Sequence, residues 1–516
     1  MRRIRLAAAF LTVGVWTLAS RVLGFGRDIL ITAYLGAGPV AEAFYVAFAL
    51  PNMFRRFFAE GAFNMAFVPM FSKRLQAGDA PDRFASDAAS GLAAVLVVFT
   101  LLAQLAMPGL VIAMAVGFLG DERFDLAVDF GRIVFPYVLF ISLAALASGV
   151  LNALGRFWAA AAAPVLLNVI LIASMGTAAW AGADVGRWLV YAVPVAGVAQ
   201  LALVWIAVRR AGIRLRLRWP RLTPELRRLA VIAAPAALAG GVVQINLLVG
   251  RQVASLTEGA VVWLSVADRL YQLPLGVVGI AIGVALLPDL SRKLAAGDGT
   301  GGAAAVNRAT EFGLALTLPA AAALAVIPGP LISVLFERGA FTDLDSAASA
   351  AALAIYGLGL PAFVLQKVYQ PVFFAREDTR TPFRYALVAM LVNLVAAVGL
   401  MPVIGYLAAP VATTLSGWAM LALLRRGARR IEGAIVADAR LRRRLGRLAL
   451  AAAMMALVVL LLADGMAVAL QTEGLRYGAL AAVVGFGALS YGVMALAFRG
   501  LVLSDLRAYL RRSQRP

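Results

Sequence analysis

The sequence of 516 residues contains no cysteine and no histidine. The lack of cysteine excludes disulfides and thiol nucleophiles, and the lack of histidine excludes acid–base catalysis by imidazole. Zinc, haem and iron–sulfur sites that need these ligands are excluded as well. Enzymatic chemistry would have to rest on carboxylates or hydroxyls alone, and we expect no resident cofactor.

Charged residues are also scarce, at 14% of the chain, whereas 62% of the residues are hydrophobic and the mean hydropathy is +0.88. Apolar runs near the roughly 20 residues needed to cross a bilayer recur from one end of the chain to the other. The sequence therefore predicts an all-α polytopic membrane protein with about fourteen transmembrane helices. Their expected positions are 7–34, 40–72, 86–117, 127–153, 158–181, 187–208, 227–252, 259–290, 306–335, 347–373, 383–402, 405–424, 446–470 and 477–499.

Basic residues occupy every second connection between the predicted spans. Segments such as 72–83, 209–228 and 425–447 are rich in Lys and Arg, whereas the intervening loops carry mainly Asp and Glu. The positive-inside rule then places both chain termini in the cytoplasm, which requires an even number of spans. These arginines also account for the net charge of +20, because they set topology and contact anionic headgroups. We therefore expect membrane lipids, and no nucleic acid, as partners.

The chain contains an internal repeat. Segment 67–79 (FVPMFSKRLQAGD) closely matches segment 286–298 (LLPDLSRKLAAGD). The copies are separated by an even number of predicted spans, so they share an orientation and form a parallel repeat. This predicts two six-helix lobes around a central cavity, with two further helices at the C-terminal end. The expected divisions are an N-terminal lobe at 1–208, a basic cytoplasmic linker at 209–226, a C-terminal lobe at 227–424, a second basic linker at 425–445, and the last two helices with the tail at 446–516.

Several charged residues fall inside the predicted spans. They lie in the first, second and eighth spans and are Arg21, Arg27, Asp28, Arg55, Glu60, Asp268 and Arg269. A charge at bilayer depth costs at least about 2.5 to 3.5 kcal/mol, so such residues usually face a protein interior or a water-filled cavity. The excess of arginine predicts an anionic cargo, with forked guanidinium contacts to phosphate. Two structural alternatives stay open: Arg55 can snorkel to an interface, and Glu60 can pair with Arg56 on the helix surface.

Longer motifs follow one another along nearly the whole chain. They are 20–28 (SRVLGFGRD), 43–48 (AFYVAF), 50–52 (LPN), 55–63 (RRFFAEGAF), 66–69 (AFVP), 151–153 (LNA), 267–270 (ADRL) and 375–382 (AREDTRTP). In this order they resemble the MurJ/MviN family of bacterial lipid II flippases. The resemblance implies a fold of the multidrug/oligosaccharidyl-lipid/polysaccharide exporter superfamily and a cargo of undecaprenyl-pyrophosphate-linked peptidoglycan precursor.

The resemblance also implies a set of site residues. The cavity arginines of the family match Arg21, Arg27, Arg55 and Arg269, and the carboxylate beside them matches Asp28. In the family, the two extra C-terminal helices form a hydrophobic groove that leads into the cavity. The corresponding segments of this chain are nearly free of internal charge, which suits a polyprenyl tail.

Two features depart from the family pattern. Some relatives have a glutamate shortly after the eighth-span arginine, where this chain has Gln272. Some also bind sodium through carboxylates, and here Asn393 and Thr413 match the neutral ligands while Gly250 and Ala397 stand where the acids align. We therefore expect transport without a complete sodium site.

The expected function is a non-enzymatic flippase that moves lipid II from the cytoplasmic to the outer leaflet of the bacterial inner membrane, by alternating access, for cell-wall biosynthesis. The nearest alternative is a flippase for another polyprenyl-linked oligosaccharide. A drug exporter is disfavoured by the arginine excess, and an enzyme acting on prenyl pyrophosphate by the arginine beside each intramembrane acid, which leaves no carboxylate pair for magnesium. Proteins of cell division or cell-wall synthesis are candidate partners.

Overall fold

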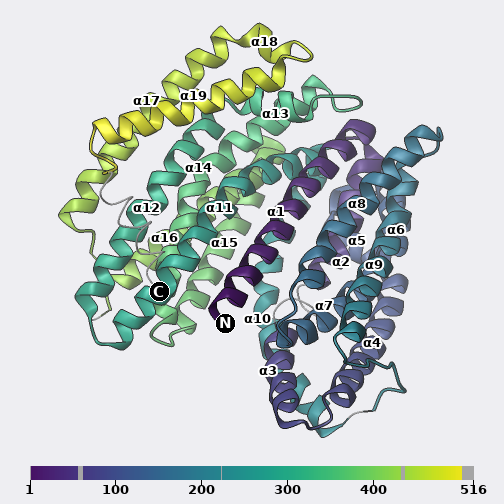
Figure 1. Cartoon of the computed structure of the whole chain (residues 1–516). Helices are drawn as coiled ribbons and strands as arrows, with labels where there is room; N and C mark the ends of the chain where they lie inside the picture. The colour runs from purple at the N-terminus through teal and green to yellow at the C-terminus, as the bar shows by residue number, and fades with distance from the viewer. Residues whose placement is uncertain (1, 56–61, 222, 432–435, 503–516) are drawn as a thin grey trace. The chain divides into compact units, whose positions relative to one another are not determined.

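The computed structural model of the protein describes residues 2–55, 62–221, 223–431 and 436–502, and helices make up most of these ranges (Figure 1). The chain forms two compact units. Unit 1 comprises Met1–Val262 together with the short segment Arg338–Phe341, and unit 2 comprises Trp263–Glu337 and Thr342–Pro516.

Unit 1 contains the helices of the first half of the chain. They are α1 (Arg2–Leu35), α2 (Pro39–Arg55), α3 (Ala62–Ala77), α4 (Pro81–Leu105), α5 (Met107–Met114), the 3₁₀ turn η2 (Val116–Phe118), α6 (Glu122–Val134), α7 (Tyr137–Ala153), α8 (Trp158–Trp180), α9 (Val185–Arg210) and α10 (Pro224–Ser255). Within the unit, α1 packs against α8 and α2 packs against α6. Arg27 and Asp28 of α1 and Glu42 near the start of α2 are buried in this arrangement.

Unit 2 begins within α11, whose first three residues belong to unit 1. Its helices are α11 (Ala260–Ala295), α12 (Gly299–Val326), α13 (Pro328–Phe336), α14 (Asp343–Phe374), α15 (Arg380–Ile404), the 3₁₀ turn η3 (Gly405–Leu407), α16 (Ala408–Ala428), α17 (Ala439–Gly465), α18 (Ala467–Gln471) and α19 (Arg476–Ala497). The last three lie at the yellow end of the colour scale in Figure 1, where α17 runs along α12.

The helices agree closely with the predicted spans, and the all-α polytopic fold class is confirmed. Nine stretches of the described residues are long and apolar enough to cross a membrane, and one of them runs from α15 through η3 to the end of α16. Where one predicted span became two helices, proline explains the division, because it lacks the N–H that continues a helix. Pro108 is the second residue of α5, and Pro328 is the first residue of α13. The number of fourteen crossings stays a prediction.

The predicted turn near residues 403–405 is present. Gly405 has a φ of 57°, in the left-handed region that glycine adopts without strain, and it separates α15 from α16. The lobes predicted from the repeat also stay a prediction. The repeat places α10 at the start of the C-terminal lobe, whereas the contacts within the structure group α10 with unit 1.

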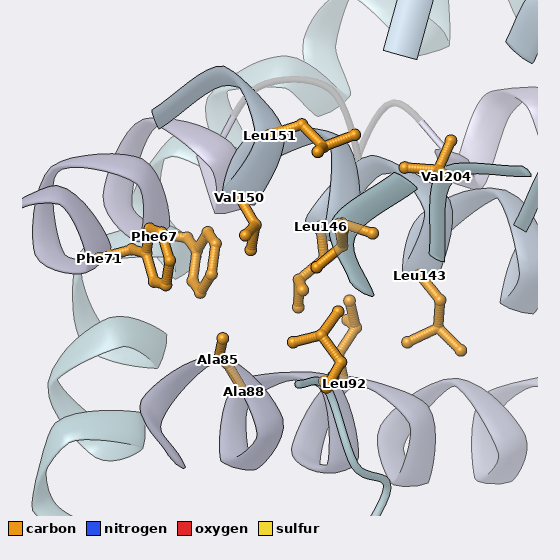
Figure 2. Close-up of a cluster of buried hydrophobic side chains, with 14 of the residues drawn as sticks. Phe67, Phe71, Ala85, Ala88, Leu92, Leu143, Leu146, Val150, Leu151 and Val204 are labelled. Carbon is orange, nitrogen blue, oxygen red and sulfur yellow. The ribbon is translucent and has the colours of Figure 1, made fainter. Parts of the chain in front are cut away.

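The core of unit 1 is built from aromatic rings packed on small side chains. Phe67 and Phe71 of α3 stack at a centroid distance of 5.7 Å, and Phe84 of α4 stacks on Phe67 at the same distance. Figure 2 shows the rings of Phe67 and Phe71 on the side of the cluster that also holds Ala85 and Ala88 of α4, whose small methyl groups leave room for close approach. Because lipid is as apolar as these side chains, the packing is stabilised mainly by van der Waals contact rather than by the hydrophobic effect.

The two C-terminal helices are attached to α12 and α13 of unit 2. Apolar residues of α17 and α19 share one cluster with residues of both helices. At one end of that contact, Glu311 of α12 pairs with Arg308, Arg440 and Arg444, of which the last two belong to α17. Farther along, the hydroxyl of Tyr491 donates to the Ala315 carbonyl at 2.7 Å. The C-terminal pair is therefore held by polar contacts as well as by apolar packing.

Candidate functional site

Two of the predicted site residues form a buried ion pair on α1. Arg27 is 9% exposed and Asp28 is 5% exposed. The guanidinium Nε and Nη2 of Arg27 donate to Oδ1 of Asp28 at 3.0 and 2.6 Å. Neighbours in a helix sequence point about 100° apart, so the long Arg27 side chain must bend toward the short side chain of Asp28 to make this contact. We call these two residues the α1 ion pair.

Asn168 of α8 completes this arrangement. Its carbonyl oxygen accepts a hydrogen bond from Nη1 of Arg27 at 3.0 Å, and its amide nitrogen donates to the carbonyls of Ser20 and Pro164 at 3.0 and 3.2 Å. Gly24 lies directly beneath, and a methyl group there would already touch the Asn168 amide at 3.5 Å. A methyl group would therefore fit at Gly24 in ordinary van der Waals contact, and only a larger side chain would crowd the Asn168 amide.

The electrostatics of the α1 ion pair follow from these contacts. Asp28 neutralises Arg27, and the pairing offsets the cost of removing both charges from water. A guanidinium carries five N–H donors, and three of those of Arg27 have partners within the described part of the chain. Two N–H groups therefore remain to donate to a ligand. The ring of Phe48, 5.8 Å from the guanidinium carbon, adds a favourable cation–π contact.

The remaining predicted residues of unit 1 differ in environment. Arg21 lies six residues before Arg27 on α1 and is exposed. No carboxylate of the described residues pairs with it, so its full charge is available in the space that α1 faces. Arg55 is the last residue of α2 and is half-buried. Glu60 lies outside the described residues.

The predicted residues of unit 2 lie on α11. Asp268 and Arg269 are both half-buried, and Asp268 accepts a hydrogen bond from the amide of Gln272 one turn later. The glutamine that replaces an acid of some relatives thus becomes a partner of Asp268. Arg269 belongs to unit 2 and the α1 ion pair to unit 1, so their common role stays a prediction.

The two candidate sodium ligands lie on α15 and α16. Asn393 is buried, and Thr413 is half-buried. Ala397, which stands at the position of an expected acid, is one turn beyond Asn393 and also buried, so a methyl group occupies the place of a carboxylate. The reduced sodium site stays a prediction.

Sequence reasoning missed a lysine within a membrane span. Lys367 lies on α14 inside the apolar stretch Asp343–Phe374. A methyl group at Gly279 of α11 would overlap its ammonium group, so Gly279 makes the space that the lysine end occupies. A scan for intramembrane charge would have found Lys367, and it is a further cation beside the helix that carries Arg269.

A second missed cluster surrounds Arg123 at the start of α6. Its guanidinium donates to Glu42 of α2 at 2.9 Å and to Asp121 at 2.6 Å, and Glu42 also accepts from the backbone amide of Val261 at 3.1 Å. The hydrogen bond from Arg123 holds the pKa of the Asp121 carboxyl below its ordinary value. Since Glu42 is fully buried, this cluster stabilises unit 1 by joining α2, α6 and the start of α11.

Comparison with known proteins gives a consistent result. The family model described as "Lipid II flippase MurJ" matches residues 31–473. The chain is 46% identical to the "Probable lipid II flippase MurJ" of Rhizobium meliloti (strain 1021), over 98% of this chain and 96% of that protein. It is 49% identical to the protein of the same description from Rhizobium tropici, over 80% and 79% of the two chains.

Solved structures agree on the fold. A structure described as "Lipid II flippase MurJ, inward closed conformation" matches with a TM-score of 0.79 at 22% identity, covering 95% of this chain and 99% of that one. An inward-facing multidrug resistance MATE family transporter of the MOP superfamily matches with a TM-score of 0.66 at 14% identity, covering 83% and 94%. These matches establish that the chain shares the fold of the two structures.

Proposed function

This chain belongs to the MurJ family of lipid II flippases, and we propose that it moves lipid II from the cytoplasmic to the outer leaflet of the bacterial inner membrane. The family is one of transporters rather than enzymes. The observation that carries the proposal for this chain is the buried α1 ion pair, in which a carboxylate and an amide orient an arginine while two of its N–H groups remain available. Pyrophosphate is the part of lipid II that such a group binds.

We propose the following roles for the site residues. Arg27 donates its two remaining N–H groups to a phosphate oxygen, and Asp28 and Asn168 hold the guanidinium plane in place. Arg21, which is exposed and has no carboxylate partner among the described residues, supplies the net positive charge that attracts the pyrophosphate. We assign the same role, attraction of the pyrophosphate, to Arg55 and Arg269.

The division of labour has a physical reason. An arginine that is both buried and unpaired is costly, whereas a neutralised arginine attracts anions weakly. The chain meets both demands by pairing Arg27 with Asp28 for orientation and by leaving Arg21 exposed for attraction. The bound anion then interacts with one oriented donor and with one net charge.

The direction of transport agrees with the membrane potential. We propose that both chain termini are cytoplasmic, as the basic connections support. Lipid II then carries negative charge outward across an inside-negative membrane, which is favourable by about 2.3 kcal/mol per charge for each 100 mV. Alternating access driven by this potential needs no ion gradient of its own.

Depletion of the protein in growing cells tests the function directly. A membrane-impermeant reagent that binds lipid II reports the amount in the outer leaflet, and total lipid II is measured after extraction. We expect outer-leaflet lipid II to fall while total lipid II rises. Unchanged outer-leaflet lipid II after depletion would refute the proposal, and a chemically altered lipid after incubation with the purified protein would indicate an enzyme.

A further inference from the structure

A groove lies within unit 2, and none of the residues assigned to the pyrophosphate lines it. It has a volume of about 660 Å³, within the usual range for ligand pockets. Four helices line it, namely α12, α14, α16 and α17, whereas α19 contributes no lining residue. Its walls are apolar along most of their length, with side chains such as Leu314, Leu365 and Leu445.

One end of the groove is basic. Arg425 and Arg429 lie at the end of α16, and Arg442 lies near the start of α17. All three are exposed, and none forms an ion pair with a carboxylate of the described residues. On the same helix, Arg440 and Arg444 pair with Glu311 instead. The three lining arginines therefore give this end of the groove a net positive charge, whereas Glu311 balances the charges of Arg440 and Arg444.

An aromatic residue lines the groove away from its basic end. Trp418 of α16 lines the groove, and its indole N–H donates to the carbonyl of Leu358 at 3.1 Å. The distance from Trp418 to Arg429 along α16 is about 16 Å, at 1.5 Å per residue. The hydrocarbon of one leaflet is about 15 Å thick, half of the roughly 30 Å bilayer core. The groove thus matches one leaflet in length, with its basic end at the side that the positive-inside rule places in the cytoplasm.

We propose that this groove binds an anionic phospholipid of the cytoplasmic leaflet. The phosphate contacts Arg425, Arg429 and Arg442, and an acyl chain lies along the apolar walls as far as Trp418. The charge at one end and the length of one leaflet together favour this occupant over a free anion, which would leave the apolar walls uncovered. The groove uses none of the arginines proposed to bind the pyrophosphate, and of the two C-terminal helices expected to face the polyprenyl tail only α17 lines it.

Tryptophan quenching tests the proposal on the full chain in lipid vesicles. The vesicles contain one part phosphatidylglycerol to nine parts phosphatidylcholine, with brominated acyl chains on one lipid at a time. Subtracting the signal of W418F isolates the emission of Trp418. We expect brominated phosphatidylglycerol to quench Trp418 well beyond its share of the lipid, and brominated phosphatidylcholine to quench it less than its own share predicts.

Two triple variants provide the decisive comparison. R425Q/R429Q/R442Q removes the three lining arginines, and R426Q/R430Q/R443Q removes three exposed arginines of the same segments that do not line the groove. Both lose the same charge. From the attraction that each arginine near a membrane surface adds, the first variant should weaken phosphatidylglycerol binding on the order of 100-fold, and the second should bind like the parent chain. Matching unfolding temperatures show that both variants are folded.

Three results would overturn the proposal. Quenching by each lipid in proportion to its share of the vesicle, or equal loss in the two triple variants, would mean that the lining arginines select no phospholipid. Release of the quenching by inorganic phosphate alone would identify a simple anion site. Release by undecaprenyl pyrophosphate at a lower concentration than that of phosphatidylglycerol would assign the groove to the polyprenyl cargo.

Discussion

The α1 ion pair allows the structural role of Arg27 to be separated from its role in transport. Arg27→Ala leaves Asp28 buried without its cation, and removing one partner of a buried pair costs about 3 to 5 kcal/mol. The folded-to-unfolded ratio should therefore fall by roughly 100- to 5,000-fold. The double variant Arg27→Ala/Asp28→Ala removes both charges and should recover most of that stability, yet it should still fail to transport lipid.

Thermal unfolding of the purified variants measures stability, and growth with the variant as the sole copy measures function. Arg27→Lys should keep the charge but transport only partly, because an ammonium group has no planar fork. Arg187→Ala is the matched control, since its pair with Asp184 is exposed and worth under about 1 kcal/mol. A double variant that supports normal growth at a normal protein level would show that the cation is not needed for transport.

Four further predictions follow from the other sites. Asn168→Ala removes one hydrogen bond to the α1 ion pair and two to backbone carbonyls. The free energy of unfolding should therefore fall by roughly 2 to 4 kcal/mol, and lipid transport should slow. A variant with unchanged unfolding and transport would contradict this. Asn393→Ala should have a small effect, and transport into potential-clamped vesicles should persist without sodium; strict sodium dependence would refute it. Lys367→Ala should reduce transport while Lys367→Arg retains part of it, as measured by growth of the sole-copy strain, and equal growth of both would remove Lys367 from the site. Because the pKa of Asp121 is lowered in the folded state, the stability that its ionised carboxylate adds is complete above the unfolded pKa of about 3.9 and is lost as the pH falls through the folded pKa. Between pH 3 and 6, the unfolding temperature of Arg123→Gln should therefore drop less steeply than that of the parent chain. Parallel curves for the two proteins would refute the assignment.

The sequence predicted the helices well because membrane burial imposes a simple pattern. A segment that crosses lipid must satisfy its backbone internally and expose apolar side chains, so hydropathy and proline together locate helices such as α8 and α9 within a few residues. The division of a predicted span at Pro328 was harder to foresee, because proline within a helix is often tolerated, as it is at Pro361. Whether a proline ends a helix or is tolerated within it depends on the helices packed around it, which the local sequence does not reveal.

The site was predictable in its charges but not in its contacts. Arg27 and Asp28 attract attention because charge is rare inside spans, and their adjacency suggested pairing. Asn168 could not be assigned, because a neutral amide 140 residues away gives no signal of its distance from α1. Lys367 was detectable from charge alone, but its neighbour Gly279 becomes informative only when α11 and α14 are placed side by side.

The segment Arg338–Phe341 has a consequence for how the protein is made. Its Ala340 amide donates to the Ala33 carbonyl at the end of α1, and Gly339 and Gly36, both with positive φ, leave space for that contact. This segment belongs to unit 1 although it is synthesised about 80 residues after Val262. At about 5 to 20 residues per second, the ribosome needs roughly 4 to 16 s more before unit 1 is complete. During that interval the end of α1 lacks its final partner, so the insertion machinery or a chaperone has a window in which to act on it.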